Sequence, residues 1–192
     1  MAGEAIEFTG NPPTPRECDS QVKYYRNFFE ASRDGKWLLL PGGTCIKKDI
    51  IPKTGGFGHG RVNGEDTLLF MKLGEAGTFA WLTDPPVLGY FRHADSSCGD
   101  PVRGYLGNLV LIGAEKKKEF GSSKTFEKDR IRIVTTHCRS NCGFLMNARE
   151  FKAALTLYRQ TFFWNFRLRR WKFLVGFWFR MFDCFFRRSR HL

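Results

Sequence analysis

Residues 130–151 read RIRIVTTHCRSNCGFLMNAREF, and this stretch decides which fold we expect. Polar and apolar side chains alternate through RIRIVTTHC (130–138), which is the pattern of a β-strand with one buried face. The pattern becomes helical from Asn147, where Glu150 three residues later fits a capping box. Cys142 is therefore predicted to lie between a strand and a helix.

The chain before this stretch is predicted to supply the rest of a small antiparallel sheet. Short apolar or alternating runs are separated by turns rich in Gly, Pro and Asp, which is typical of a meander. The runs are WLLL (37–40), TCIKKDII (44–51), TLLFMKL (67–73), TFAWL (78–82) and, as a further candidate, VLGYFR (87–92). The stretch NLVLIGAEKKKEFG (108–121) is ambiguous: its first half fits a strand, and its second half fits a helix that ends at Gly121. The fold class is predicted to be α+β.

Four segments follow from these patterns. Residues 1–18 are expected to be a flexible lead because three prolines interrupt them. Residues 19–36 are expected to hold a short helix, 37–151 the main domain and 152–192 a C-terminal helix. The polar opening does not resemble a secretory signal, and no run of 18 uncharged apolar residues predicts a spanning helix.

The positive charge lies mostly in the C-terminal segment. The chain carries 31 Lys+Arg and 19 Asp+Glu, a formal net charge of +12. Residues 149–192 hold 11 Lys+Arg and 2 Asp+Glu, so they account for +9 and the rest of the chain for +3. An anionic partner is expected to meet this segment. Six cysteines in 192 residues are too few for a disulfide scaffold, so we expect reduced thiols in the cytoplasm.

A helical wheel of residues 164–188 separates aromatic from basic side chains. One broad face carries Trp164, Leu168, Trp171, Leu174, Val175, Trp178, Met181, Phe182, Phe185 and Phe186. The opposite face carries Arg169, Arg170, Lys172, Arg180, Arg187 and Arg188. This pattern suits a helix at a membrane interface, where rings enter the acyl boundary and guanidinium groups meet anionic lipid. The alternative is a helix packed on the sheet or in a partner's groove.

Cys142 and His59 are the candidate nucleophile and general base. The free N–H groups at a helix N-terminus lower a thiol pKa, which gives the predicted position of Cys142 a physical basis. His59 follows a Gly-rich turn and precedes an apolar run. The alternative is that Cys142 is a half-buried structural cysteine.

The stretch from Ser140 resembles the NC box of the lecithin:retinol acyltransferase-like family, relatives of NlpC-type papain-like thiol enzymes. The matching positions are Asn141, Cys142, Leu145, Met146 and Asn147. Upstream, Pro41-Gly42-Gly43, His59, Val62, Gly64 and Asp66 resemble the family's H-box region, and Ala114 to Gly121 resembles the helix between the boxes. The resemblance covers roughly residues 37–151.

The resemblance implies a permuted papain-like fold and a thiol acyltransferase or phospholipase A1/A2. Cys142 would attack an acyl ester of a glycerophospholipid, His59 would take its proton, and a thioacyl-enzyme would pass the chain to an acceptor. No cofactor or metal is implied. The partners would be an acyl-lipid substrate and an intracellular membrane, held by Trp164, Trp171, Trp178 and Phe182 with Arg169, Arg170 and Arg180.

Other functions are suggested by positions where this chain differs from the family's pattern. The family's second His has no counterpart, since Phe70 occupies that region, and the residue that orients His59 is unknown. The second hypothesis is therefore a non-catalytic relative, like some viral proteins with the same boxes, that binds a membrane or RNA. CGDPVRGYLG from Cys98 resembles the nucleophile region of a chymotrypsin-like viral protease. A zinc site is a further alternative, with His137, Cys138 and Cys142 and either Cys98 or His93 as ligands.

Overall fold

The computed structural model describes residues 2–3, 5–8, 19–34, 41–57, 62–91 and 100–186. The fold is α+β, as the sequence predicts, and the structure is mostly helical. The chain divides into two compact units, the first made of residues 1–60 and 65–99 and the second of residues 61–64 and 100–192.

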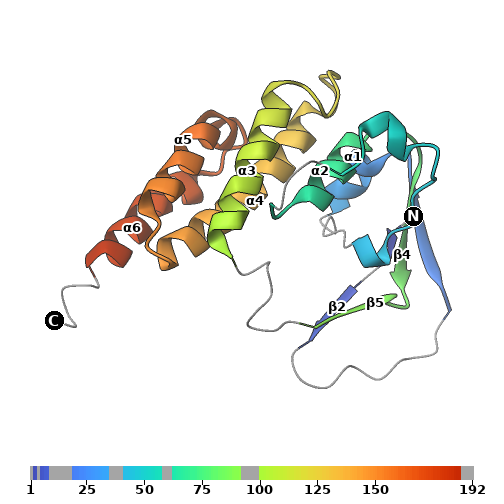
Figure 1. Cartoon of the computed structure of the whole chain (residues 1–192), viewed down its shortest axis with the longest axis horizontal. Coiled ribbons are helices and arrows are strands. Elements are labelled where there is room, and N and C mark those ends of the chain that lie inside the picture. Colours follow the sequence, from blue (N-terminus) through green and yellow to red (C-terminus); the bar gives the residue numbers. More distant parts are fainter. Residues whose placement is uncertain are drawn as a thin grey trace. The chain divides into compact units, whose positions relative to one another are not determined.

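The first unit holds two small sheets (Figure 1). In one, β4 (Phe79–Asp84) lies between β1 (Ala2–Gly3) and β3 (Gln21–Tyr25), parallel to β1 and antiparallel to β3. In the other, β2 (Ala5–Phe8) pairs in parallel with β5 (Leu88–Phe91).

Short helices complete the first unit. They are α1 (Phe28–Ala31), α2 (Glu65–Lys72) and the 3₁₀ turns Ser32–Asp34, Pro41–Gly43 and Ile51–Thr54. Asn27 caps α1 by accepting a hydrogen bond from the Glu30 N–H at 2.9 Å. An aromatic and aliphatic cluster forms the core of this unit: Phe28, Phe29, Leu69, Phe70, Met71 and Trp81.

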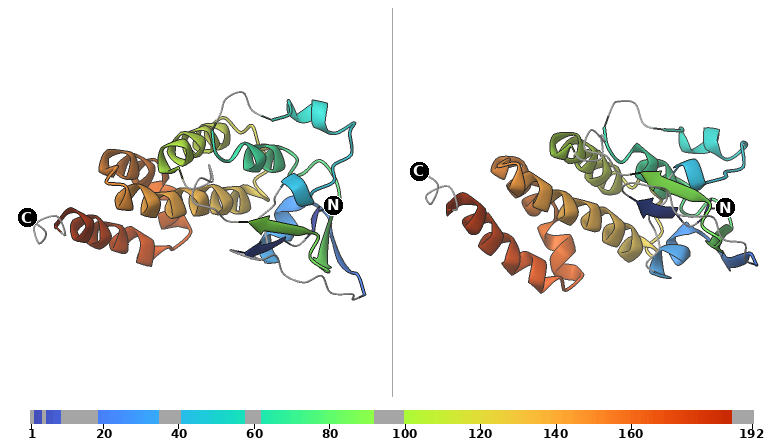
Figure 2. Two further views of the ribbon diagram at one scale, coloured as in Figure 1. Left: turned by 60° about the horizontal axis from the view of Figure 1, so that its bottom comes forward. Right: turned by 90° about the horizontal axis from the view of Figure 1, so that it is seen from below.

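Four helices build the second unit: α3 (Pro101–Lys116), α4 (Glu127–Asn147), α5 (Phe151–Arg167) and α6 (Trp171–Phe186). Asp100 starts α3 by accepting hydrogen bonds from the Val102 and Arg103 N–H groups, with Pro101 at the first helical position. Helix α4 contacts the other three helices, which are grouped together in every view (Figure 1, Figure 2).

The core of this unit follows a helical period along α4. Ile131, Val134, Cys138, Cys142 and Leu145 are each at most 2% exposed. Burying such side chains contributes about 1.5–3 kcal/mol each to stability. Arg130 and Glu115 form a buried ion pair beside them, with Nε and Oε2 3.0 Å apart.

Several predicted strands are wrong. Residues 130–138 belong to α4, because the buried positions continue at helical spacing to Leu145 and override the short alternation. Residues 67–73 lie mostly in α2, where four consecutive side chains are buried, a pattern that a short apolar run cannot distinguish from a strand. Residues 44–51 form turns and the start of a 3₁₀ helix.

Other elements agree in part. The strand predicted at 78–82 is confirmed as β4, and 87–92 contains β5. The open stretch 108–121 begins inside α3. The helix predicted within 19–36 is wrong over Gln21–Tyr25, which pair with β4 as β3, and right only for α1. Residues 37–40 and most of 1–18 lie outside the described residues.

The predicted single C-terminal helix is two helices. Helix α5 ends at Arg167 and α6 begins at Trp171, and Arg169 between them adopts a left-handed φ of 55°. The N–H of Arg170 donates to the carbonyl of Asn165 across this turn at 3.0 Å. The break changes which side chains of the segment share a face.

Candidate functional site: the predicted thiol and an exposed aromatic surface

The sequence predicts Cys142 at a helix N-terminus. In the structure it lies inside α4 instead. It is 2% exposed, and its Sγ lies 3.6 Å from the carbonyl oxygen of Ala154 on α5, to which the thiol donates. Burial raises the pKa of the Cys142 thiol to about 12. The helix-terminus argument for a lowered thiol pKa is therefore wrong, and the thiol is protonated at neutral pH.

His59, the predicted general base, lies outside the described residues. The Cys142–His59 pair therefore stays a prediction. The neighbouring Asn141 of the NC-box resemblance donates from Nδ2 to the carbonyl of Pro101 at 3.3 Å, so it ties α4 to the start of α3. Phe70, the residue in the region of the family's second His, is buried in the first unit.

The predicted zinc ligands do not form a cluster in the described part of the chain. Cys138 is fully buried and its thiol donates to Asn108 Oδ1 at 3.2 Å, and burial raises its pKa far above the ordinary value. No group of three or more His, Cys, Asp or Glu in this part could hold a metal ion. The further zinc candidates, Cys98 and His93, lie outside the described residues. The protease hypothesis depends on Cys98 and therefore stays a prediction.

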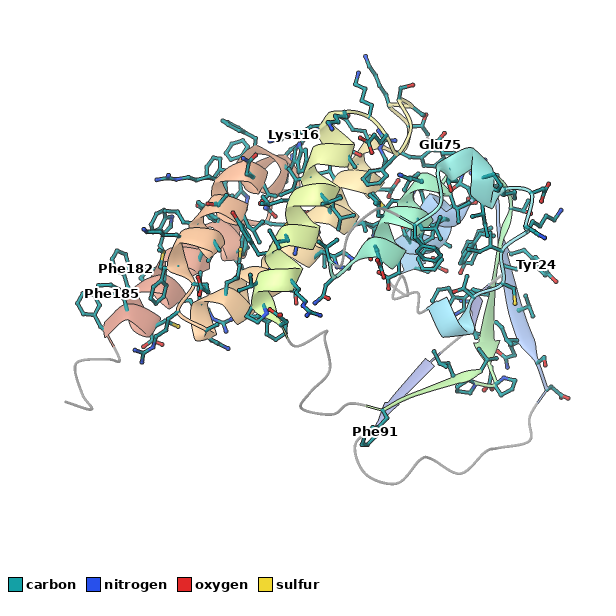
Figure 3. The ribbon with its side chains drawn as sticks, in the orientation of Figure 1. Tyr24, Glu75, Phe91, Lys116, Phe182 and Phe185 are labelled. Carbon is teal, nitrogen blue, oxygen red and sulfur yellow. The ribbon has the colours of Figure 1, made fainter. Side chains whose placement is uncertain are left out.

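The largest gathering of exposed apolar side chains in the second unit runs along α6. We call it the α6 aromatic surface; its members are Trp171, Val175, Trp178, Phe179, Phe182, Phe185 and Phe186. Their exposed fractions range from 41% for Trp178 to 72% for Phe179. Figure 3 shows Phe182 and Phe185 near the C-terminal end of α6, where the Phe185 ring also meets the Phe151 ring of α5 with centroids 6.1 Å apart. Soluble surfaces rarely expose contiguous apolar area of this kind without a binding role.

The opposite side of α6 holds the helix against α5. Leu174 and Phe177 are 6% and 3% exposed, and the Phe177 ring stacks on Tyr158 with centroids 4.2 Å apart. The Tyr158 hydroxyl donates to the carbonyl of Leu174 at 3.1 Å, and it accepts from Trp178 Nε1 at 3.3 Å. The buried side is thus satisfied by packing within the unit, and the aromatic surface remains available.

The end of α5 continues this surface. Phe166 is 51% exposed, and its ring meets Trp171 edge to face with centroids 5.0 Å apart. Of the predicted membrane contacts, Trp171, Trp178 and Phe182 are exposed, whereas Trp164 is only half-buried. Phe179, the most exposed ring of α6, is not among the residues predicted for this face, although it lies one turn from Val175 and Phe182 on the helix.

The predicted basic contacts occupy three different environments. Arg169 is exposed in the turn before α6. Arg180 Nη2 donates to Asn147 Oδ1 at 3.1 Å, and its guanidinium lies beside Gly143, where a Cβ would come within 3.2 Å of it. Arg170 is half-buried against α4, where its guanidinium donates to Thr135.

None of the described helices is both long and apolar enough to cross a membrane. Comparisons with protein-family models, curated proteins and solved structures find no match to this chain.

Proposed function

We propose that this chain binds the surface of an anionic membrane through the α6 aromatic surface, in a unit that acts without catalysis. The observation that carries the proposal is that α6 buries Leu174 and Phe177 on one side, while the other side exposes a continuous set of Trp, Phe and Val side chains. Amphipathic helices with this composition lie in the plane of the interface with their rings in the headgroup and acyl boundary.

The charge around this surface favours an anionic membrane over a neutral one. Lys172 and Arg180 are exposed on α6, and Asp183 is its only described acidic residue. Residues 149–192 together carry a net charge of +9. Each Lys or Arg held near an anionic leaflet contributes about 1 kcal/mol to binding. Aromatic insertion and charge attraction would therefore act together.

The composition also favours a lipid surface over a second copy of this chain. A copy would bring the same positive charge to the interface, and like charges across an interface oppose association. An RNA partner would meet the same positive charge, so RNA binding is one of the outcomes that the test below distinguishes.

Quenching of tryptophan fluorescence by brominated lipid tests the proposal. Vesicles of phosphatidylcholine and phosphatidylserine with brominated acyl chains should quench the full-length protein, because Trp171 and Trp178 would lie at the acyl boundary. The Trp171→Phe/Trp178→Phe protein should lose most of this quenching. Trp81→Phe is the matched control, since Trp81 is 5% exposed in the first unit, and it should retain the quenching.

Three outcomes would overturn the proposal. The first is that the protein does not bind these vesicles. The second is a dimer in sedimentation velocity with Trp171 and Trp178 shielded from acrylamide. The third is binding of single-stranded RNA without binding of lipid. Each assigns the surface to a different partner.

The thiol acyltransferase or phospholipase activity, with its NlpC-type permuted arrangement, stays a prediction from the sequence resemblance. A membrane-bound location in the cytoplasm is common to it and to the present proposal. The burial of Cys142 favours the non-catalytic alternative, because attack on an ester needs an accessible thiolate. Phospholipid turnover that is lost in both Cys142→Ala and His59→Ala would establish the enzyme instead.

A further inference from the structure

A row of polar side chains on α4 faces the beginning of α6. Arg132, Thr135, Thr136 and Arg139 recur at three- and four-residue intervals, so they share one side of the helix. Arg170, in the turn before α6, reaches this row. Its Nη1 donates to Thr135 Oγ1 at 2.6 Å, and its Nη2 donates to Thr136 Oγ1 at 3.0 Å and to the carbonyl of Arg132 at 3.3 Å.

These contacts hold the Arg170 guanidinium without neutralising it. All three acceptors are uncharged, and no carboxylate of the described residues lies within salt-bridge distance of Arg170 or Arg139. The nearest ion pair of the row joins Arg132 Nη2 to Asp129 Oδ1 at 3.7 Å. Burial and the positive charges of Arg139 and Arg132 lower the pKa of Arg170 to about 10.

Arg139 is the less satisfied of the two. Its Nε is buried and has no hydrogen-bond partner in the described part of the chain. Its guanidinium carbon lies 5.6 Å from the centroid of the Phe173 ring on α6, a cation–π contact. A buried donor without an acceptor costs about 1–3 kcal/mol, and it needs an explanation in a well-packed helical unit.

We propose that Arg139 and Arg170, with Thr136 and Arg132 beside them, form a binding site for a phosphate monoester. A dianionic phosphate matches the two uncompensated guanidinium charges, and its oxygens would accept from the solvent-facing side of the Arg139 guanidinium. Arg139 and Arg170 are both partly exposed, so a ligand can reach the site from solvent. The phosphate can come from a soluble compound or from a lipid headgroup, and the proposal does not depend on membrane binding by the α6 aromatic surface.

Titration of the full-length protein with inorganic phosphate, in chloride buffer at constant ionic strength, tests the site. We expect saturable binding by calorimetry and a rise in the thermal midpoint. Arg139→Gln should weaken this binding by about tenfold or more, because it removes charge-assisted hydrogen bonds to the ligand. This variant should fold, since the Arg139 Nε has no hydrogen-bond partner to lose and the substitution removes only the cation–π contact with Phe173.

A matched control removes equal or greater charge elsewhere. Lys152 and Arg159 are exposed on α5, and Lys152→Gln/Arg159→Gln should change phosphate binding less than twofold. If the control and Arg139→Gln weaken binding equally, the effect is general electrostatics and the proposed site is wrong. The absence of saturable phosphate binding by wild type overturns the proposal too.

Vesicles distinguish the two sources of phosphate. Phosphatidic acid presents a monoester and phosphatidylserine a diester, so the two are compared at matched surface charge. Preference for phosphatidic acid that is lost in Arg139→Gln assigns the site to a lipid headgroup. Binding of free phosphate with no such preference assigns it to a soluble phosphate compound, and both results support the site.

Discussion

Replacing two rings of the α6 aromatic surface should release the protein from anionic vesicles. Phe179 and Phe182 are 72% and 57% exposed, so each ring has about 110 Å² of apolar area available to the membrane. If half of that area enters the acyl boundary, each ring contributes about 1.4 kcal/mol at about 25 cal/mol per Å². Phe179→Ser/Phe182→Ser should then weaken partitioning by about 3 kcal/mol, or roughly a hundredfold.

Co-sedimentation with phosphatidylcholine–phosphatidylserine vesicles measures this loss. Phe57 and Phe91 of the first unit are 51% and 49% exposed, so Phe57→Ser/Phe91→Ser makes the same chemical change in the other unit. This control should bind within about threefold of wild type, and both variants should keep the wild-type circular dichroism. Equal losses in the two variants would refute a binding role specific to α6.

Further predictions address the charges, the thiols and the buried ion pair. Raising salt from about 0.1 to about 0.5 M should weaken vesicle binding of the wild type severalfold without abolishing it. Salt screens the attraction of Lys and Arg to the lipid but does not prevent ring insertion. Complete loss of binding in salt would contradict ring insertion. Cys142 should react with iodoacetamide at pH 8 far more slowly than exposed Cys45, since a thiol with a pKa of about 12 is only roughly 10⁻⁴ thiolate at that pH. Peptide mass spectrometry measures the labelling of the two cysteines separately. Fast labelling of Cys142 would show that the thiol is accessible to solvent. Glu115→Ala should lower the free energy of unfolding by about 3–5 kcal/mol in urea, because it leaves Arg130 buried without its carboxylate. Burial outweighs the attraction of Arg130 and raises the pKa of Glu115. The contribution of Glu115 titration to stability is therefore fully present below the ordinary glutamate pKa and is lost as pH rises through the raised pKa. Glu115→Ala should lose this part of the pH dependence of the unfolding free energy.

The candidate surface could be predicted in outline from residues 164–188. The excess of Trp, Phe and Arg there indicates an amphipathic helix, and Trp171, Trp178 and Phe182 are indeed exposed. The pattern could not show that the segment breaks at Arg169, since nothing in the local sequence marks that left-handed turn as a glycine would. Arg170 therefore looks like a surface cation in the sequence and lies against α4 in the fold.

Local composition was enough to indicate the α+β class, the strands β4 and β5, and a basic aromatic C-terminal segment, because these depend on short-range patterns and net charge. Long-range packing decided that residues 130–138 are helical and that Cys142 is buried, since α4 contacts α3, α5 and α6 and buries side chains from Ile131 to Leu145. It also brought Arg139 and Arg170, which are far apart in the sequence, to the same polar row. A period of two over a few residues has little energetic weight against burial of a helical face that spans several turns.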